Sequence, residues 1–300
     1  MLSRRSILFA SAAAALSQPM RALHAQTVAT ATIAERAVSV LSDGAFEMPL
    51  AMAARDIAPA EIEAVTRASG PLVSVLNVTC IRQGDATVMI DCGSGANFLP
   101  GTGKLGASLE QAGVKPESVT HVLFTHLHPD HFWGALDDFD TPLFPNAKWI
   151  ADRREIAFWT DPKVYERLPE DRHAFAAGAQ RIVKELGDRL EAGSPGHEWA
   201  PGIASFDTAG HTPGHVSFEL NGADGPLFVL GDALTHPQIS FARPQWRPAS
   251  DHDGDLAVAA RQRVLARATA EKAQVIGYHL PGALGRVERD GAAFRFVKAG

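Results

Sequence analysis

The sequence THLHPDH, residues 125–131, decides how the rest of the chain is interpreted. It crowds four potential metal ligands into six positions: His126, His128, Asp130 and His131. A short apolar run before the motif predicts a strand, and in extended backbone two side chains two positions apart point to the same side. His126 and His128 can therefore share one ion. Pro129 suits the first turn of a helix, and the coiled chain beyond it aims the last two ligands at a second position, about 3.5–4 Å from the first in bimetallic sites.

Further ligands must come from elsewhere, because a catalytic zinc site needs at least three protein ligands and an open position. Three later segments each place a potential ligand just after a short apolar run. TAGHTPGH contains His211, LFVLGDAL contains Asp232 and AQVIGYHLPG contains His279. Ligand sites in α/β folds gather beyond the carboxyl ends of strands. We therefore expect these side chains to converge with the first motif on one edge of the sheets.

The apolar spacing along the chain predicts strands that alternate with helices. The predicted strands are residues 36–41, 72–81, 87–91, 121–125, 147–151, 203–207, 216–220, 227–230, 275–278 and 294–297. The predicted helices are residues 60–68, 104–112, 152–159, 174–191 and 255–272, and residues 44–69 otherwise form a loop. This order is typical of an α/β fold with mixed sheets. Because no linker is evident, residues 26–300 are predicted to form a single catalytic domain.

Residues 1–25 have the organisation of an export signal. A twin arginine, Arg4 and Arg5, precedes a ten-residue apolar run that is too short to span a bilayer, and small residues follow near Ala25. The start resembles a twin-arginine export motif; a general secretory signal with a chance arginine pair is the alternative. Either signal predicts a periplasmic protein. No later stretch is long and apolar enough to act as a membrane anchor.

The net charge of −6 does not favour nucleic acid or an anionic membrane surface as a partner. The two cysteines, Cys80 and Cys92, stand on the arms of a predicted hairpin around Gly84. In that register Cys80 faces residue 88 or 89, and Cys92 lies too far along its strand for a disulfide. Two buried free thiols are therefore predicted.

The order of the histidine and aspartate motifs resembles the metallo-β-lactamase superfamily: an H-x-H-x-D-H block, then His, Asp and His after successive strands. The resemblance also covers IDCGSG before the block and HTPGH after it. It implies a four-layered αββα sandwich with two mixed β-sheets. It assigns one ion to His126, His128 and His211, a second ion to Asp130, His131 and His279, and a bridging role to Asp232. It further implies that Asp91 supports the ligand loop, and His215 is predicted to orient it.

Two divalent ions per chain are therefore predicted, Zn²⁺ by default, with Fe, Mn or Co as ions that the same ligands accept. A metal lowers the pKa of bound water from 15.7 to about 7. A hydroxide bridging the two ions is expected to attack a carbonyl or phosphoryl centre, with Asp232 holding both ions and Asp130 orienting or relaying the proton. No serine stands in a nucleophile elbow, and both cysteines lie in apolar runs that do not suit a thiolate. The predicted reaction is hydrolysis.

Within the superfamily, the chain most resembles the methyl-parathion-hydrolase-like branch, on THLHPDH, HTPGH, FPNA and the ending GYHLPGALGRV. Aromatic side chains line the substrate pocket in that branch. The counterparts here are Phe98, Trp159 and Phe175, for which an ordinary place in the core is the alternative interpretation. The implied substrate is a flat apolar lactone, ester or aryl phosphotriester. Members of the branch are commonly homodimers, so a homodimer is expected.

Two alternative functions remain. Quorum-quenching acyl-lactone hydrolases place a tyrosine three residues after the bridging aspartate, where this chain has Thr235, which disfavours that assignment but does not remove it. The second alternative is a metal-binding sensor without turnover, against which the intact ligand set argues. The motif DHDGD, residues 251–255, contains metal-like side chains, but its predicted role is to cap the following helix. The remaining histidines are predicted to be structural or solvated: His121, His173, His197, His236 and His252.

Overall fold

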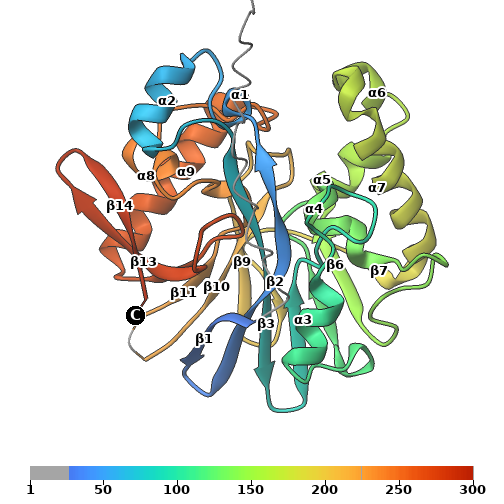
Figure 1. The fold of residues 1–300 in the computed structure, drawn as a ribbon. Helices are drawn as coiled ribbons and strands as arrows, with labels where there is room; N and C mark the ends of the chain where they lie inside the picture. The colour runs from blue at the N-terminus through green and yellow to red at the C-terminus, as the bar shows by residue number, and fades with distance from the viewer. Residues whose placement is uncertain (1–26, 224, 300) are drawn as a thin grey trace, which may run out of the picture.

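The computed structural model describes residues 27–223 and 225–299 (Figure 1). The predicted export signal, residues 1–25, lies outside the described residues. Among the helices that the structure describes, none is long and apolar enough to cross a membrane.

In the part of the chain that the structure describes, two mixed sheets of seven strands each form the centre of the fold (Figure 1). The first sheet contains, in spatial order, β1 (Thr27–Ile33), β2 (Arg36–Met48), β3 (Leu72–Gln83), β4 (Ala86–Ile90), β5 (His121–Leu123), β6 (Lys148–Asp152) and β7 (Leu190–Gly193). The second contains β8 (Glu198–Ala200), β9 (Ile203–Asp207), β10 (Val216–Leu220), β11 (Leu227–Val229), β12 (Gln274–Ile276), β13 (Leu284–Asp290) and β14 (Ala293–Lys298). Pairing is parallel from β4 to β7 and between β11 and β12, and antiparallel elsewhere.

The alternation of apolar side chains along the strands sets the layers. Val88 and Ile90 of β4 belong to a buried cluster that also contains Val229 of β11, so these side chains fill the space between the two sheets. Because successive side chains point to opposite faces, Met89 and Phe228 belong instead to clusters on the outer faces. Both sheets therefore bury both faces.

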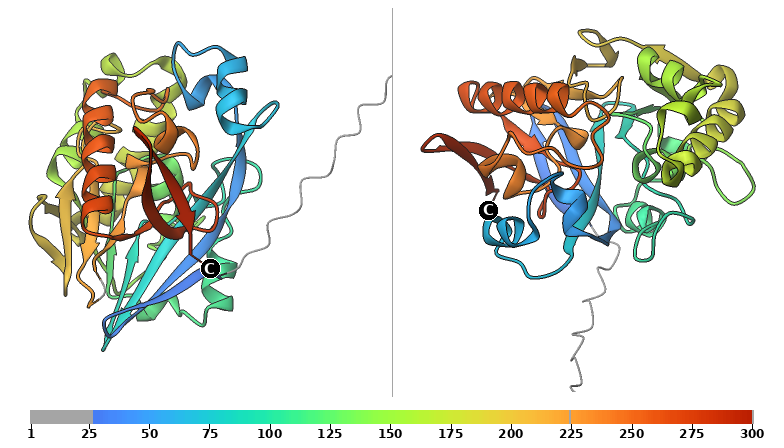
Figure 2. Two further views of the ribbon diagram at one scale, coloured as in Figure 1. Left: turned by 90° about the vertical axis from the view of Figure 1, so that its left-hand side faces the viewer. Right: turned by 90° about the horizontal axis from the view of Figure 1, so that it is seen from above.

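Helices cover the outer face of each sheet, and Figure 2 shows the two helical layers on opposite sides. The first sheet is covered mainly by α3 (Leu105–Gln111), α4 (Pro129–Phe132), α5 (Arg153–Thr160), α6 (Val164–Arg167) and α7 (His173–Leu186). The second is covered by α8 (Ile239–Ala242) and α9 (Gly254–Ala270), and α1 (Leu50–Ala53) and α2 (Pro59–Thr66) pack near α8. These four layers confirm the predicted αββα sandwich.

Strand β2 is longer than predicted and continues to Met48, inside residues 44–69, which were expected to form a loop and a short helix. The strand passes a bulge beside Gly44, whose φ is +106°. A Cβ on Gly44 would lie 2.1 Å from the carbonyl oxygen of Gly101, so the close approach requires glycine. The extension places Phe46 and Met48 on a cavity wall described below.

The predicted helix 174–191 is also corrected. Helix α7 ends at Leu186, and Gly187 follows with φ +52°. Residues 190–193 then form β7, which pairs in parallel with β6. Sheet pairing therefore overrides the helical spacing of the last residues. The strands β1, β8 and β13 were not predicted either.

Three local predictions are confirmed. Cys80 lies opposite Met89 in the β3–β4 hairpin, and both cysteines are buried and free. Pro129 begins α4. Asp253 caps α9, because its side chain accepts a hydrogen bond from the backbone N–H of Leu256.

Candidate metal centre

The loops that contain the seven predicted ligands meet at one edge of the sheets. His211 follows β9, Asp232 follows β11 and His279 follows β12. Strands β9 and β11 both run antiparallel to β10, and β12 is parallel to β11. The three strands therefore run in one direction, and their carboxyl ends emerge at the same edge. The THLHPDH loop follows β5 of the first sheet and meets them there.

Three buried histidines point their ring nitrogens at one another. His126 Nε2 lies 3.0 Å from His128 Nδ1, and His211 Nε2 lies 2.9 Å from the same His128 atom. All three side chains are buried. Imidazole nitrogens this close together can direct their lone pairs at a common cation. We call these residues the three-histidine group.

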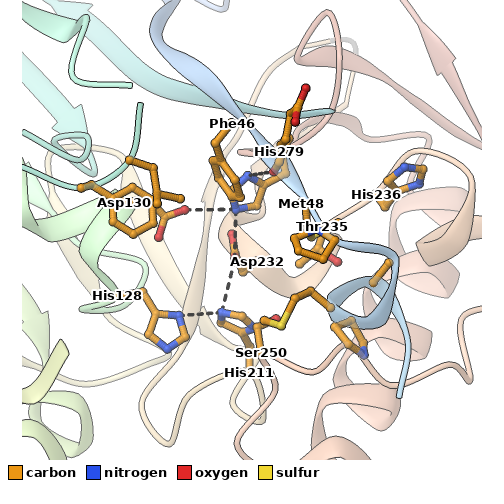
Figure 3. Close-up of a pocket in the computed structure, with 18 of the residues that line it drawn as sticks. Phe46, Met48, His128, Asp130, His211, Asp232, Thr235, His236, Ser250 and His279 are labelled. Carbon is orange, nitrogen blue, oxygen red and sulfur yellow. Dashed lines mark hydrogen bonds and ion pairs between the residues drawn. The ribbon is translucent and has the colours of Figure 1, made fainter. Parts of the chain in front are cut away.

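Asp130, His131 and His279 form a second group. Figure 3 shows Asp232 between His279 of this group and His211 of the three-histidine group. His279 Nε2 lies 3.4 Å from Asp130 Oδ2 and 3.2 Å from Asp232 Oδ2. Asp232 Oδ2 is also 3.2 Å from His211 Nε2, whereas Asp232 Oδ1 is 3.2 Å from His131 Nε2. One carboxylate thus touches both groups, as a bridging ligand must.

Two atoms at the centre of this arrangement test whether a metal fits. Among the described residues, His131 Nε2 and Asp232 Oδ1 are buried and have no hydrogen-bond partner. They lie 3.2 Å apart without the alignment of a hydrogen bond. Buried polar atoms are rarely left unpaired in native proteins, and a cation would satisfy both. Imidazole and carboxylate donors suit Zn²⁺ and related divalent ions, so the residues present fit divalent metal binding.

The electrostatics of the site agree with this donor set. Burial, reinforced by the neighbouring histidines, holds the pKa of His126 and of His128 well below the ordinary value, so both rings are neutral at pH 7. Burial alone would raise the pKa of Asp232. The neighbouring histidines, His279 foremost, outweigh burial and hold the pKa of Asp232 well below its ordinary range. Neutral imidazoles and an ionised carboxylate are the forms that bind metal. His131 and His279 differ from His126 and His128, because the neighbouring carboxylates, Asp232 foremost, outweigh burial and raise the pKa of both rings. A metal ion bound there would displace their protons.

Asp91 supports the ligand loop in the way that the resemblance implies. The carboxylate is buried, and its Oδ2 lies 2.8 Å from His131 Nδ1. Its Oδ1 accepts a hydrogen bond of 2.8 Å from the backbone N–H of Thr125. Such a partner fixes the tautomer and orientation of a metal-binding histidine. Asp91 therefore leaves His131 Nε2 free to face the site.

His215 orients the loop that contains Asp232. Its Nε2 accepts a hydrogen bond of 3.0 Å from the backbone N–H of Asp232, while its Nδ1 lies 2.8 Å from Thr208 Oγ1. On the opposite side of the site, His279 Nδ1 lies 2.9 Å from the carbonyl oxygen of Val75. These contacts fix the orientation of the His215 and His279 rings and of the Asp232 loop. They leave His279 Nε2 and the Asp232 carboxylate facing the site.

Glu155 joins two ligand loops and was not singled out from the sequence. This fully buried carboxylate accepts hydrogen bonds from the backbone N–H groups of Leu127 at 3.0 Å and Gly214 at 2.8 Å, and from Trp159 Nε1 at 2.7 Å. Burial raises the pKa of Glu155. From the sequence, an acidic residue in a short predicted helix is expected to face solvent. Only the fold shows that Glu155 is bound to both ligand loops.

An apolar cavity of about 490 Å³ opens onto the ligands. His128, Asp130, His211, Asp232 and His279 reach its surface, as Figure 3 shows. Phe98 and Phe175 line it, as the resemblance implies, and Thr235 lines it too. The wall also contains side chains that the sequence did not point to, among them Phe46, Met48, Met52, Leu99 and His236.

The expectation that Trp159 lines the pocket is corrected. Its side chain is fully buried in the cluster between the first sheet and the helices, and it is absent from the cavity wall. Trp159 stands four residues after Glu155, so both lie on one inward face of α5. Its ring meets the edge of the His128 ring with centroids 5.7 Å apart. Trp159 therefore packs against His128 from the side of the core and does not face the cavity.

The fold and its buried histidine–aspartate centre define an α/β sandwich with a metal-binding site. The sequence profile of the Metallo-beta-lactamase superfamily matches residues 73–279. The chain therefore belongs to the metallo-β-lactamase superfamily.

Named relatives and solved structures agree with this family. An N-acyl homoserine lactonase from Bacillus sp is 27% identical over 172 residues, which cover 57% of this chain and 60% of that protein. A hydroxyacylglutathione hydrolase from Erythrobacter litoralis (strain HTCC2594) is 32% identical over 126 residues, 42% of this chain and 38% of that protein. The matches thus span less than two thirds of either relative.

Two solved structures have the same fold over most of their length. AidC, a dizinc quorum-quenching lactonase in complex with a product, aligns with a TM-score of 0.86 at 23% identity, covering 92% of this chain and 98% of that chain. The hydrolase AbOPH, of the beta lactamase superfamily, aligns with a TM-score of 0.84 at 25% identity and the same coverage, 92% and 98%.

Proposed function

We propose that this protein is a dinuclear, metal-dependent hydrolase of ester bonds. The observation that carries the proposal is the contact of Asp232 with both ligand groups at the floor of an apolar cavity. The donor set favours Zn²⁺, and the dizinc content of AidC supports the same choice.

In this proposal, the three-histidine group would hold one ion, the group Asp130, His131 and His279 would hold the other, and Asp232 would serve as a ligand shared by the two groups. When bound, the ions supply Lewis acidity and a water of lowered pKa. Asp130 reaches the cavity surface, so its carboxylate can accept the proton of the attacking water and pass it to the leaving oxygen. The apolar wall excludes bulk water and thereby strengthens these electrostatic contacts.

The cavity wall favours a neutral substrate with an apolar group. Phe98, Phe175 and Met48 offer aromatic and flexible apolar surface close to the ligands. A lactone or ester with an alkyl or aryl substituent suits this wall, and the N-acyl homoserine lactonase from Bacillus sp favours a lactone. The two phenylalanines and the resemblance to the methyl-parathion-hydrolase-like branch support an aryl phosphotriester as a second candidate.

A substrate panel with the zinc-loaded protein tests this function. Hydrolysis of an acyl lactone or a phenyl ester, lost on metal removal and restored by Zn²⁺, is the expected result, and an aryl phosphotriester distinguishes the second candidate. Two bound ions without turnover of any panel member would support a metal-binding sensor instead. Absence of metal binding would refute the proposal outright.

We also propose that the protein is exported to the periplasm and forms a homodimer. The order of charged, apolar and small residues in residues 1–25 supports the export, and the resemblance to the methyl-parathion-hydrolase-like branch supports the dimer. Cell fractionation with an Arg4→Lys, Arg5→Lys variant tests the twin-arginine route. Light scattering of the purified protein tests the dimer, and a monomer mass at micromolar concentration would contradict it.

A further inference from the structure

The segment Asp251–His252 lies directly behind the three-histidine group. It belongs to the motif DHDGD, whose Asp253 caps α9. The two residues before Asp253 have a different environment, since Asp251 is fully buried and His252 packs among aromatic rings. Helix capping therefore accounts for one residue of the motif and leaves these two unexplained.

Asp251 contacts His211 on the side away from the site. Its Oδ1 lies 3.0 Å from His211 Nδ1, while His211 Nε2 faces His128 and Asp232. A carboxylate can only accept a hydrogen bond, so the proton of a neutral His211 ring resides on Nδ1. The lone pair of His211 Nε2 is then directed into the three-histidine group.

His252 contacts His128 in the corresponding way. His128 Nδ1 faces the other two histidines of the group, and its Nε2 lies 3.4 Å from His252 Nε2. If His128 directs the Nδ1 lone pair inward, Nε2 bears the proton and donates it to the lone pair of His252. Phe158 and Trp159 pack edge-on against the His252 ring at centroid distances of 5.2 and 5.7 Å, which holds that ring in place.

The segment itself is anchored to the ligand loop and to a buried cation. The backbone N–H of His252 donates to the carbonyl oxygen of His211 at 3.0 Å. Arg261, fully buried, places Nη2 3.3 Å from Asp251 Oδ2 and donates from Nη1 to the carbonyl oxygen of Trp246 at 2.8 Å. Asp251 is thus a paired charge whose position is determined by the core.

We propose that Asp251 and His252 are positioning residues that preorganise the three-histidine group for its metal ion. The inference rests on the proposed metal function but concerns only one of the two ions. The histidines of the other group have different partners, Asp91 for His131 and Val75 for His279. Loss of an outer hydrogen-bond partner typically weakens metal affinity 10–100-fold. Substitutions at Asp251 or His252 therefore weaken the binding of one ion and leave the binding of the other unchanged.

The test measures two stepwise Zn²⁺ affinities by competition with a chromophoric chelator. Asp251→Ala and His252→Phe each remove the acceptor, and each is expected to weaken one of the two affinities about 10–100-fold and to leave the other within about threefold. His252→Gln restores much of the loss, since its Oε1 can accept the His128 hydrogen bond. Asp253→Ala is the matched control: it removes the helix cap and lowers the melting temperature, while both affinities stay at the wild-type value.

A second readout identifies the ion. In a His279→Ala background, which retains the three-histidine group, Asp251→Ala should weaken Co²⁺ binding at the remaining site and shift the visible absorption of the bound ion. Unchanged affinities in both variants would overturn the inference, as would equal losses in Asp253→Ala. If Asp251→Ala does not fold, the His252→Phe and His252→Gln pair decides alone. Wild-type protein that binds no metal overturns this inference and the proposed function, whereas two ions without turnover overturn only the proposed function.

Discussion

Substitution of Trp159 by alanine should damage the core and leave substrate binding nearly intact. The fully buried indole packs between the first sheet and α7, and truncation of a buried Trp or Phe to Ala costs about 3–5 kcal/mol. Removal of the indole N–H also deprives the buried Glu155 carboxylate of its 2.7 Å donor, which adds about 1–3 kcal/mol. The expected loss is about 4–8 kcal/mol, a large part of the 5–15 kcal/mol typical of whole domains.

Phe175→Ala is the matched comparison, because Phe175 is half-buried and lines the cavity. Its removal should lower stability by no more than about 1–2 kcal/mol and raise KM for an aryl ester severalfold. Urea denaturation of the metal-free proteins measures stability, and steady-state kinetics of the zinc-loaded proteins measures KM. If Trp159→Ala loses less than about 1 kcal/mol while KM rises as in Phe175→Ala, the indole lines the pocket and the assignment to the core is wrong.

Three further predictions concern the site and its wall. Asp232→Asn should reduce Zn²⁺ affinity by more than the 10–100-fold typical of an outer partner, because both ligand groups lose their shared carboxylate; two tightly bound ions by metal analysis would contradict the bridging role. Gly231→Ala should cost about 1–3 kcal/mol in denaturation experiments, because Gly231 has φ +52° and a Cβ there would lie 2.8 Å from His215 Nε2; a fully stable variant would show that the loop can shift. Burial lowers the pKa of His236 to about 4, so the folded state binds the neutral form of the ring in preference to the protonated form. This contribution to stability is fully present above the ordinary pKa of 6.5 and is lost as the pH falls toward 4. Relative to His236→Asn, the metal-free wild type should lose about 3 kcal/mol of unfolding free energy between pH 7 and pH 4, and parallel pH curves for the two proteins would refute this.

Much of the candidate site could be predicted because its ligands are local to strand ends. His211, Asp232 and His279 each follow a short apolar strand, and strands of the same direction deliver their loops to one edge. The spacing within THLHPDH likewise divides its members between two groups without knowledge of the remaining fold. The two cysteines followed the same logic, since a hairpin register is a local property.

The cavity wall could not be predicted in the same way. Phe46 and Met48 reach it only because β2 continues past a bulge beside Gly44. Gly44 must be a glycine there because the carbonyl oxygen of Gly101, a residue distant in sequence, occupies the space that a Cβ would need. Trp159 was placed in the wall by the resemblance to the methyl-parathion-hydrolase-like branch, but its position on α5 turns it into the core. A side chain's face depends on contacts with distant segments, which residue type does not encode.

The sequence by itself determined the α/β class and the seven metal-type ligands near strand ends, because strand periodicity and the spacing of ligands along the chain are local. The αββα layering and the division of all seven ligands into two groups were implied by the resemblance to the metallo-β-lactamase superfamily. Only the tertiary structure decided which side chains stand behind those ligands. Asp251 and His252 read as part of a helix cap, yet they contact His211 and His128, which lie 40 and 124 positions away along the chain. Contacts across such separations arise from the packing of the two sheets and their helices, so they become visible only once those layers are assembled.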